Sequence, residues 1–251
     1  MVGTFNSRLT RVIPVFGWLH DHGDKRWPER LVRLAHDTLD ACGDIRNLYL
    51  KRERRVQANP KRLKWMLEHA DELVPADGRR WRELRRRLQD KNRVNEAINI
   101  LKADKYQNRQ YIIEGKTCAD CLIECDKALI WIEGKRFDWL SPSTTWDDSR
   151  DQLARNVEAA WWLAQGRNKD KDRDREYRVL ICHEFPLKHH EAALLDGYRA
   201  GTWSAGWPHI SASDQRDLAK RIGTLKWSEI TSEWPDISLP DGDSHRTLAL
   251  K

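Results

Sequence analysis

The segment 119–136, ADCLIECDKALIWIEGKR, constrains the fold more than any other part of the chain. Two short apolar runs flank residues 126–127, and this pattern predicts two β-strands joined by a tight turn. Because side chains alternate between the faces of a strand, Glu133 and Lys135 are expected on the same side of the sheet. We expect Asp120, at the start of the first strand, to join them where the two strands lie side by side.

Two carboxylates and an amine on one sheet face suit a hard divalent cation beside a phosphate, because such cations prefer oxygen ligands. The alternative interpretation is a charge pair that faces solvent. The apolar run ALIWI and the Asp-bearing partner strand indicate instead a half-buried strand. A carboxylate on such a strand usually contacts a partner other than solvent. The hairpin therefore predicts a site for phosphodiester chemistry.

The spacing resembles that of the PD-(D/E)XK nuclease superfamily, in which an Asp precedes a Glu-x-Lys at the end of an apolar strand. Ala119-Asp120 stands where the family usually has Pro-Asp, and Glu133-Gly134-Lys135 matches Glu-x-Lys. The resemblance covers roughly residues 91–185. It implies an α/β fold with a restriction-endonuclease-like core, a mixed sheet of four or five strands flanked by helices. The implied activity is metal-dependent hydrolysis of DNA, in defence or repair.

The resemblance also implies roles for the motif residues. Asp120, Glu133 and the carbonyl of Gly134 would hold Mg²⁺ or Mn²⁺, which needs few protein ligands and keeps several waters. The metal would polarise a phosphodiester oxygen and lower the pKa of a bound water. Lys135 would orient or help to deprotonate that water and stabilise the charge that grows on phosphorus.

The helix expected at 149–164 follows the motif and would complete the site. Relatives often present a Gln from this helix, and Gln152 fits that role. Asn156 lies one turn further along the same face, where some relatives have a Tyr. The alternative for both residues is a solvent-exposed polar face. Of two auxiliary acids, Glu96 falls opposite the apolar stripe of its helix, whereas Glu124 shares a strand face with the motif Asp.

A second Glu-Gly-Lys occupies residues 114–116, at the end of a strand-like segment at 106–117. No strand-borne Asp precedes this copy at a suitable spacing, whereas Glu133 has Asp120 on a paired strand. We therefore assign the site to the later copy. Lys116 or Glu114 could still lie near the site, because their strand should neighbour the hairpin.

Charge is distributed unevenly along the chain. Residues 1–93 hold 22 Lys and Arg against 13 Asp and Glu, a balance of +9, whereas the remainder has a balance of −3. A basic arm would bind a polyanion through counterion release, and an acidic core would supply metal ligands. The alternative is a solvated helical surface. The nucleic-acid-binding residues expected from this pattern are Arg79, Arg82, Arg85, Arg86 and, beside the motif, Arg136.

Apolar periodicity and turn signals divide the chain into three parts. Residues 1–90 are predicted to form a basic helical extension, residues 91–234 the nuclease-like core, and residues 235–251 a polar tail. The core should begin with a helix that continues the pattern of the basic run from residue 79 to residue 101. After the hairpin and its helix we expect a further strand at 177–185 and two helices near 189–199 and 214–222.

The five cysteines offer a rival metal chemistry. Cys118, Cys121 and Cys125, with Cys182-His183 further on, have some of the spacing of a zinc knuckle. The first three lie along a predicted strand, however, where residues three apart face opposite sides. We therefore interpret Cys121 and Cys125 as small buried apolar side chains.

Composition and local sequence narrow the compartment and the partners. The apolar run at 12–20 is too short to span a bilayer, and no leader pattern precedes it, so we expect a cytoplasmic protein that does not bind membranes. DNA is the expected partner, and a protein partner or a homodimer stays open. Trp139 and Trp146, after the motif, are placed to touch bases. Alternative functions are a nucleic-acid-binding module or a partner-dependent subunit that keeps the nuclease fold.

Overall fold

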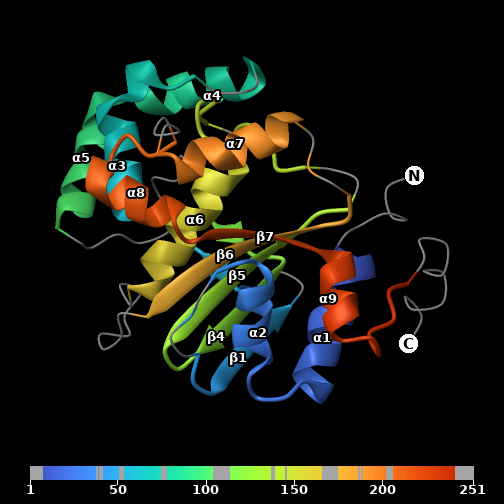
Figure 1. The fold of residues 1–251 in the computed structure, drawn as a ribbon. Helices are drawn as coiled ribbons and strands as arrows, with labels where there is room; N and C mark the ends of the chain where they lie inside the picture. The colour runs from blue at the N-terminus through green and yellow to red at the C-terminus, as the bar shows by residue number, and fades with distance from the viewer. Residues whose placement is uncertain are drawn as a thin grey trace, which may run out of the picture.

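The protein is described from a computed structural model, which covers residues 8–37, 39, 42–50, 54–74, 78–103, 114–136, 139–144, 146–165, 175–185, 187, 189–201 and 206–240. A five-stranded sheet forms its centre (Figure 1). From one edge to the other, its strands are β1 (Ile45–Leu50), β4 (Cys121–Cys125), β5 (Ala128–Gly134), β6 (Glu176–His183) and β7 (Ile222–Lys226).

The sheet is mixed, as the sequence predicted. β4 runs antiparallel to both β1 and β5, whereas β6 runs parallel to β5 and β7 parallel to β6. The turn between β4 and β5 lies at 126–127, where the sequence placed it. The α/β class and the flanking helices are confirmed. None of the described helices is long and apolar enough to cross a membrane.

Helices cover both faces of the sheet. On one face lie α1 (Ile13–His22), α2 (Trp27–Leu34) and α9 (Trp227–Glu233), with α2 in front of the strands in Figure 1, and on the other face α6 (Gln152–Ala164), α7 (His189–Arg199) and α8 (Ala212–Ala219). Each face of the sheet has its own hydrophobic core, and alternate residues of β5 pack into one core or the other. Trp131 packs with the α6 side, and Ile132 packs with the α1 side. This double burial explains why the hairpin strands read as nearly continuous apolar runs.

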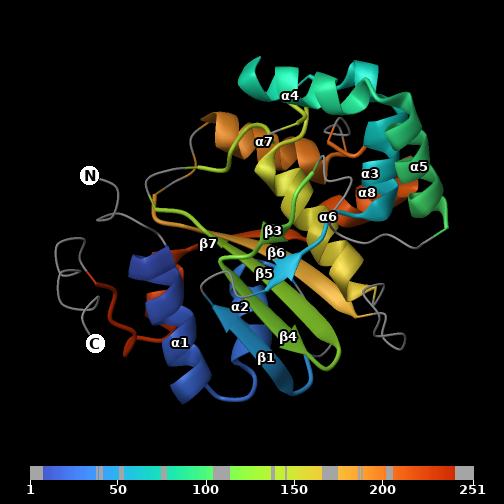
Figure 2. The same ribbon diagram turned by 180° about the vertical axis from the view of Figure 1, so that it is seen from behind.

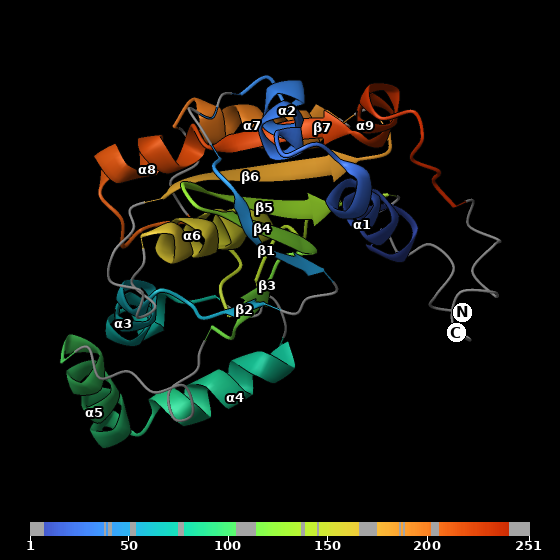
Figure 3. The ribbon, with the colours of Figure 1, turned by 90° about the horizontal axis from the view of Figure 1, so that it is seen from below.

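A helical layer lies outside α6 (Figures 2 and 3). It comprises α3 (Pro60–Glu68), the 3₁₀ turn Ala70–Glu72, α4 (Gly78–Leu88) and α5 (Lys91–Lys102), inserted between β1 and β4. Its own small core includes Leu63, Met66, Leu84 and Ala97. A two-stranded sheet of β2 (Arg55–Val56) and β3 (Thr117–Cys118) closes the insertion.

The structure corrects the prediction that the first ninety residues are all helical. Residues 45–50 form strand β1, which pairs with β4, and α1 contacts β1 directly. Leu48 and Leu50 pack against the α1 side of the core, so pairing with a distant strand outweighs the basic character of the neighbouring sequence. Elements from both sides of residue 90 therefore share one sheet.

Two further predictions change in detail. The single helix expected from 79 to 101 is broken at 89–90, where the Asp90 side chain accepts a hydrogen bond from Arg93 N at 3.2 Å and starts α5. This helix packs on α3 and α4 rather than beginning the core. Most of the strand-like segment at 106–117 lies outside the described residues, as do residues 241–251 of the tail. The strand near 177–185 and the helices α6, α7 and α8 are confirmed.

Candidate active site

The hairpin brings its acidic residues together at the carboxyl end of β5. Asp120 N donates to Ile132 O at 3.1 Å, and the Asp120 carboxylate in turn accepts a hydrogen bond of 3.1 Å from Gly134 N. The Asp120 carboxylate is thereby fixed against the backbone of the Glu133-Gly134-Lys135 motif. Asp120, Glu133 and Lys135 are exposed by only 6%, 4% and 7%.

Helix α6 completes the cluster from above the sheet. Gln152 Nε2 donates to Glu133 Oε1 at 2.6 Å, and Asn156 Nδ2 donates to Glu133 Oε2 at 3.1 Å. Lys135 Nζ lies 3.1 Å from Glu133 Oε1 and 3.4 Å from Gln152 Oε1. Both polar residues of α6 therefore face the motif, rather than solvent, and the Lys amine lies between carboxylate and amide.

Close packing explains why the middle residue of the motif is a glycine. A Cβ atom on Gly134 would lie 2.4 Å from Val12 Cγ2 and 3.2 Å from Trp227 Cζ2. Hydrogen bonds hold the residue that follows: Lys135 N donates to Cys182 O at 2.7 Å, and Trp227 Nε1 donates to Lys135 O at 2.9 Å. The end of β5 is thus held by β6, by α9 and by the π-helical turn Arg8–Val12.

The cluster offers a cation two carboxylates and backbone oxygen. Within the described residues, no three His, Cys, Asp or Glu side chains converge tightly enough to hold a metal by themselves. Mg²⁺ does not require such a cage, since it is commonly bound by one or two carboxylates and keeps several waters. The oxygen donors of Asp120 and Glu133 fit that ion. Both oxygens of Glu133 already accept hydrogen bonds, which fix the orientation of the carboxylate.

The earlier Glu-Gly-Lys has a different environment. Glu114 is 4% exposed and lies between arginines, 3.5 Å from Arg62 Nε, 3.1 Å from Arg150 Nη2 and 3.3 Å from Arg155 Nε. Lys116 is exposed. The carboxylate of this copy therefore joins buried ion pairs with three arginines.

Glu114 belongs to a larger buried ion cluster that the sequence did not reveal. Arg150 Nη2 lies 2.8 Å from Glu158 Oε2, and His209 Nε2 lies 2.7 Å from Glu158 Oε1. Burial would raise the pKa of Glu158, but Arg150 and His209 lower it to about 2. The cluster connects the helical layer with α6 and the segment before α8, and its members are Arg62, Glu114, Asp147, Arg150, Glu158 and His209.

The two auxiliary acids do not reach the site. Glu124 pairs in register with Leu129 at the opposite end of the hairpin, 3.8 Å from Arg54 Nε and 3.9 Å from Arg175 Nη1. Glu96 is exposed on α5 in the helical layer, as its position opposite the apolar stripe predicted.

The predicted DNA-binding arginines occupy two places. Arg82, Arg85 and Arg86 are exposed on α4, in the helical layer, and Arg86 Nη2 lies 3.0 Å from Glu83. Arg136 follows the motif directly and is half-buried. The Arg79 side chain lies outside the described part of the chain. Trp146 packs against the core of the helical layer, with the Arg87 guanidinium 5.9 Å from its ring centre, and Trp139 packs against the α6 side of the main core.

Four of the five cysteines are buried as apolar side chains, and Cys118 is half-buried. Cys121, Cys125 and Cys182 are fully buried in the α1 side of the core, and all five thiols are free. Burial raises the pKa of the thiols of Cys121 and Cys182. They pack among apolar side chains of the α1-side core.

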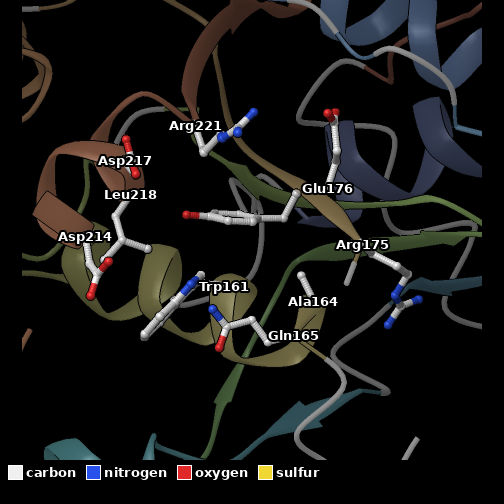
Figure 4. A pocket seen from close by; sticks show the side chains of 10 residues that line it. Trp161, Ala164, Gln165, Arg175, Glu176, Asp214, Asp217, Leu218 and Arg221 are labelled. Carbon is white, nitrogen blue, oxygen red and sulfur yellow. The ribbon is translucent and has the colours of Figure 1, made fainter. Parts of the chain in front are cut away.

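A cavity of about 410 Å³ lies at the opposite end of β6 from the cluster (Figure 4). Glu133 pairs in register with Ile181, whereas Tyr177, in the cavity wall, lies about 13 Å back along the strand. The wall mixes acidic, basic and aromatic side chains, with Asp214, Asp217 and Arg221 on one side and Trp161 on the other. The cavity is thus separate from the motif residues.

No protein-family model, no curated protein and no solved structure matches this chain.

Proposed function

We propose that this protein is a divalent-metal-dependent nuclease with a restriction-endonuclease-like core, which hydrolyses phosphodiester bonds of DNA. The observation that carries the proposal is the buried cluster of Asp120, Glu133, Lys135 and Gln152, supplied by the hairpin and by α6. An ordinary surface charge pair would be exposed and would not gather two amides from a neighbouring helix. The order of hairpin, helix α6 and parallel strand β6 is the context that the sequence resemblance requires.

In this mechanism Asp120, Glu133 and the carbonyl of Gly134 would hold Mg²⁺ or Mn²⁺. When bound, such an ion polarises a phosphoryl oxygen and lowers the pKa of a coordinated water. Lys135 places a positive charge beside Glu133, where it stabilises the negative charge that develops on phosphorus and orients the attacking water. Gln152 and Asn156 hold the Glu133 carboxylate in one orientation.

Affinity for DNA would come from phosphate contacts outside the cluster. The exposed arginines of α4 supply a basic surface, and each neutralised phosphate releases counterions. Glu83 pairs with Arg86 and Arg87, at 3.0 Å and 2.7 Å, so this surface is partly neutralised within the helix. We therefore assign α4 a contribution to affinity and none to the chemical step.

One observation favours a second candidate, a DNA-binding subunit that does not cut. The Glu133 carboxylate already pairs with the Lys135 amine. Its two oxygens also accept hydrogen bonds from the side-chain amides of Gln152 and Asn156. A scaffold that never binds a metal could keep such a closed arrangement. Incubation with DNA separates the two functions, because only the nuclease would show cleavage that depends on a metal.

The deciding experiment incubates the purified protein with circular and linear DNA in Mg²⁺, in Mn²⁺ and in chelator. We expect cleavage with either metal and none in chelator. Glu133→Gln keeps the size of the side chain but removes its charge, and should abolish cleavage. Asp214→Asn, at the separate cavity, is the matched control and should cut as the wild type does. Equal cleavage by wild type and Glu133→Gln would refute the proposal.

A further inference from the structure

Three basic side chains lie side by side at the carboxyl edge of the sheet. In the β5–β6 pair Gly134 is aligned with Cys182, so Lys135 is followed across the sheet by His183. In the β6–β7 pair His183 is aligned with Lys226. The ends of β5, β6 and β7 point toward the same edge (Figure 3).

The three side chains also share the α6 face of the sheet. Ile181 packs in the α6-side core and Cys182 in the α1-side core, so His183 returns to the α6 face. Glu133 contacts α6, which places Lys135 on the same face by the same alternation. Lys226 is on the α6 face because it is aligned with His183, and aligned residues of neighbouring strands share a face. Lys135, His183 and Lys226 therefore form a row that begins at the candidate metal site.

His183 presents one particular nitrogen to this row. It is 6% exposed, and its Nδ1 lies 2.7 Å from Phe185 O. A carbonyl can only accept a hydrogen bond, so Nδ1 carries the proton. Nε2 makes no hydrogen bond within the described residues, and it can donate to a phosphate oxygen when both ring nitrogens carry a proton.

Lys226 ends the edge strand and begins α9. Its main-chain N–H donates to Glu229 Oε2 at 2.7 Å, and its amine makes no ion pair within the described ranges. Glu184, the residue that follows β6, is bound by Arg11 at 2.7 and 2.8 Å. Its charge is therefore neutralised by that arginine. Lys135 is paired with Glu133 at 3.1 Å, so the positive charge of the row beyond the motif comes from Lys226.

We propose that this row is the path of one DNA strand, in which His183 and Lys226 contact phosphates beside the bond that lies at Glu133. Adjacent strands lie about 4.8 Å apart, so the row from β5 to β7 spans about 10 Å. One strand of a duplex carries a phosphate about every 3.4 Å along the helix axis, so this span covers more than one phosphate. The inference rests on the proposed function, but it concerns binding rather than cleavage.

Binding is measured on the Glu133→Gln background, in chelator, by fluorescence anisotropy of a labelled DNA duplex over a range of salt concentrations. Lys226→Ala should weaken binding and reduce the magnitude of the salt slope by about 0.9. His183→Asn keeps a donor for Phe185 O but removes Nε2, and should weaken binding about two- to tenfold. Lys220→Ala is the matched control, because this exposed lysine precedes the opposite end of β7.

Wild-type affinity and salt slope in both Lys226→Ala and His183→Asn would overturn the proposed path. Since His183 is buried, thermal unfolding of its variant is measured too. If His183→Asn unfolds at a clearly lower temperature, Lys226→Ala alone decides the outcome, because its side chain is only half-buried. A protein that never cuts DNA but binds it through Lys226 would refute the nuclease and keep the path. If the protein cuts DNA and neither substitution changes its binding, the nuclease proposal stands and the proposed path is refuted.

Discussion

Gln152 Nε2 donates a 2.6 Å hydrogen bond to Glu133 Oε1, and through its other amide atom Gln152 also contacts the amine of Lys135. One side chain of α6 therefore fixes both the acidic and the basic member of the Glu-Gly-Lys motif. Ser141 N donates to the same Gln152 oxygen at 3.1 Å, so the loop before α6 is tied to the cluster as well.

Gln152→Leu tests this positioning role. The substitution removes both contacts at similar volume and should lower the cleavage rate about 100-fold, because small displacements of reacting groups are costly. It should also raise the Mg²⁺ concentration needed for half-maximal rate, which a loss of stability alone would not do. Gln165→Leu, at the other end of the same helix, is the control. An unchanged metal requirement in Gln152→Leu would contradict the role.

Metal binding should be visible without any cleavage assay. A ligand that binds only the folded state stabilises it by about 2.7 kcal/mol at 100 times its Kd. Mg²⁺ should therefore raise the Tm of the wild type and leave that of Asp120→Asn unchanged. Glu124→Gln, at the far end of the same strand, should respond as the wild type does. A Tm that rises equally in Asp120→Asn would place the metal elsewhere.

The two glycines of the Glu-Gly-Lys copies should respond differently to alanine. A Cβ on Gly134 would meet Val12 at 2.4 Å, whereas a Cβ on Gly115 would meet nothing within 4 Å. We expect Gly134→Ala to reduce the free energy of unfolding by about 1–3 kcal/mol, and Gly115→Ala to change it little. Urea denaturation measures both. Val12→Ala should recover part of the loss when combined with Gly134→Ala, and strict additivity would argue against the clash.

The two glutamates should separate activity from stability. Glu114→Gln leaves three arginines with less negative charge in a buried place, and breaking such pairs costs about 3–5 kcal/mol. Cleavage per folded molecule should stay near the wild-type value. Glu133→Gln also breaks a buried ion pair, with Lys135, and should lower the urea midpoint too, but it should abolish cleavage per folded molecule. Loss of activity in folded Glu114→Gln would show that the wrong copy of the motif was chosen.

The extent of sequence-based prediction depends on how local the determinants are. The hairpin and α6 could be predicted because their apolar periodicity and turn signal lie within 119–164. Strand β1 was missed because its pairing partner, β4, lies some seventy residues further along the chain. The role of Glu114 was not predictable either, since its arginine partners come from α3, from the segment before α6 and from α6 itself.

Glu158 should make part of the stability dependent on pH. Its pKa is about 2 in the folded protein, because Arg150 and His209 outweigh burial, against an ordinary value of 4.5. A carboxylate with a lowered folded pKa stabilises the protein above its unfolded pKa, and this contribution disappears as pH falls from about 4.5 to about 2. The contribution is on the order of 3 kcal/mol. The difference in free energy of unfolding between wild type and Glu158→Gln should therefore shrink over that interval.

Glu83 is the appropriate comparison for this last experiment. Its pKa is also lowered, by Arg87 and Arg86, but the ion pairs lie on the exposed surface of α4. Salt screens exposed pairs far more than buried ones. In high salt the effect of Glu83→Gln should vanish, while that of Glu158→Gln persists because its partners are buried in the ion cluster. Equal salt sensitivity of the two variants, or a Glu158→Gln difference that does not depend on pH, would show that the buried ion pairs do not stabilise the fold in this way.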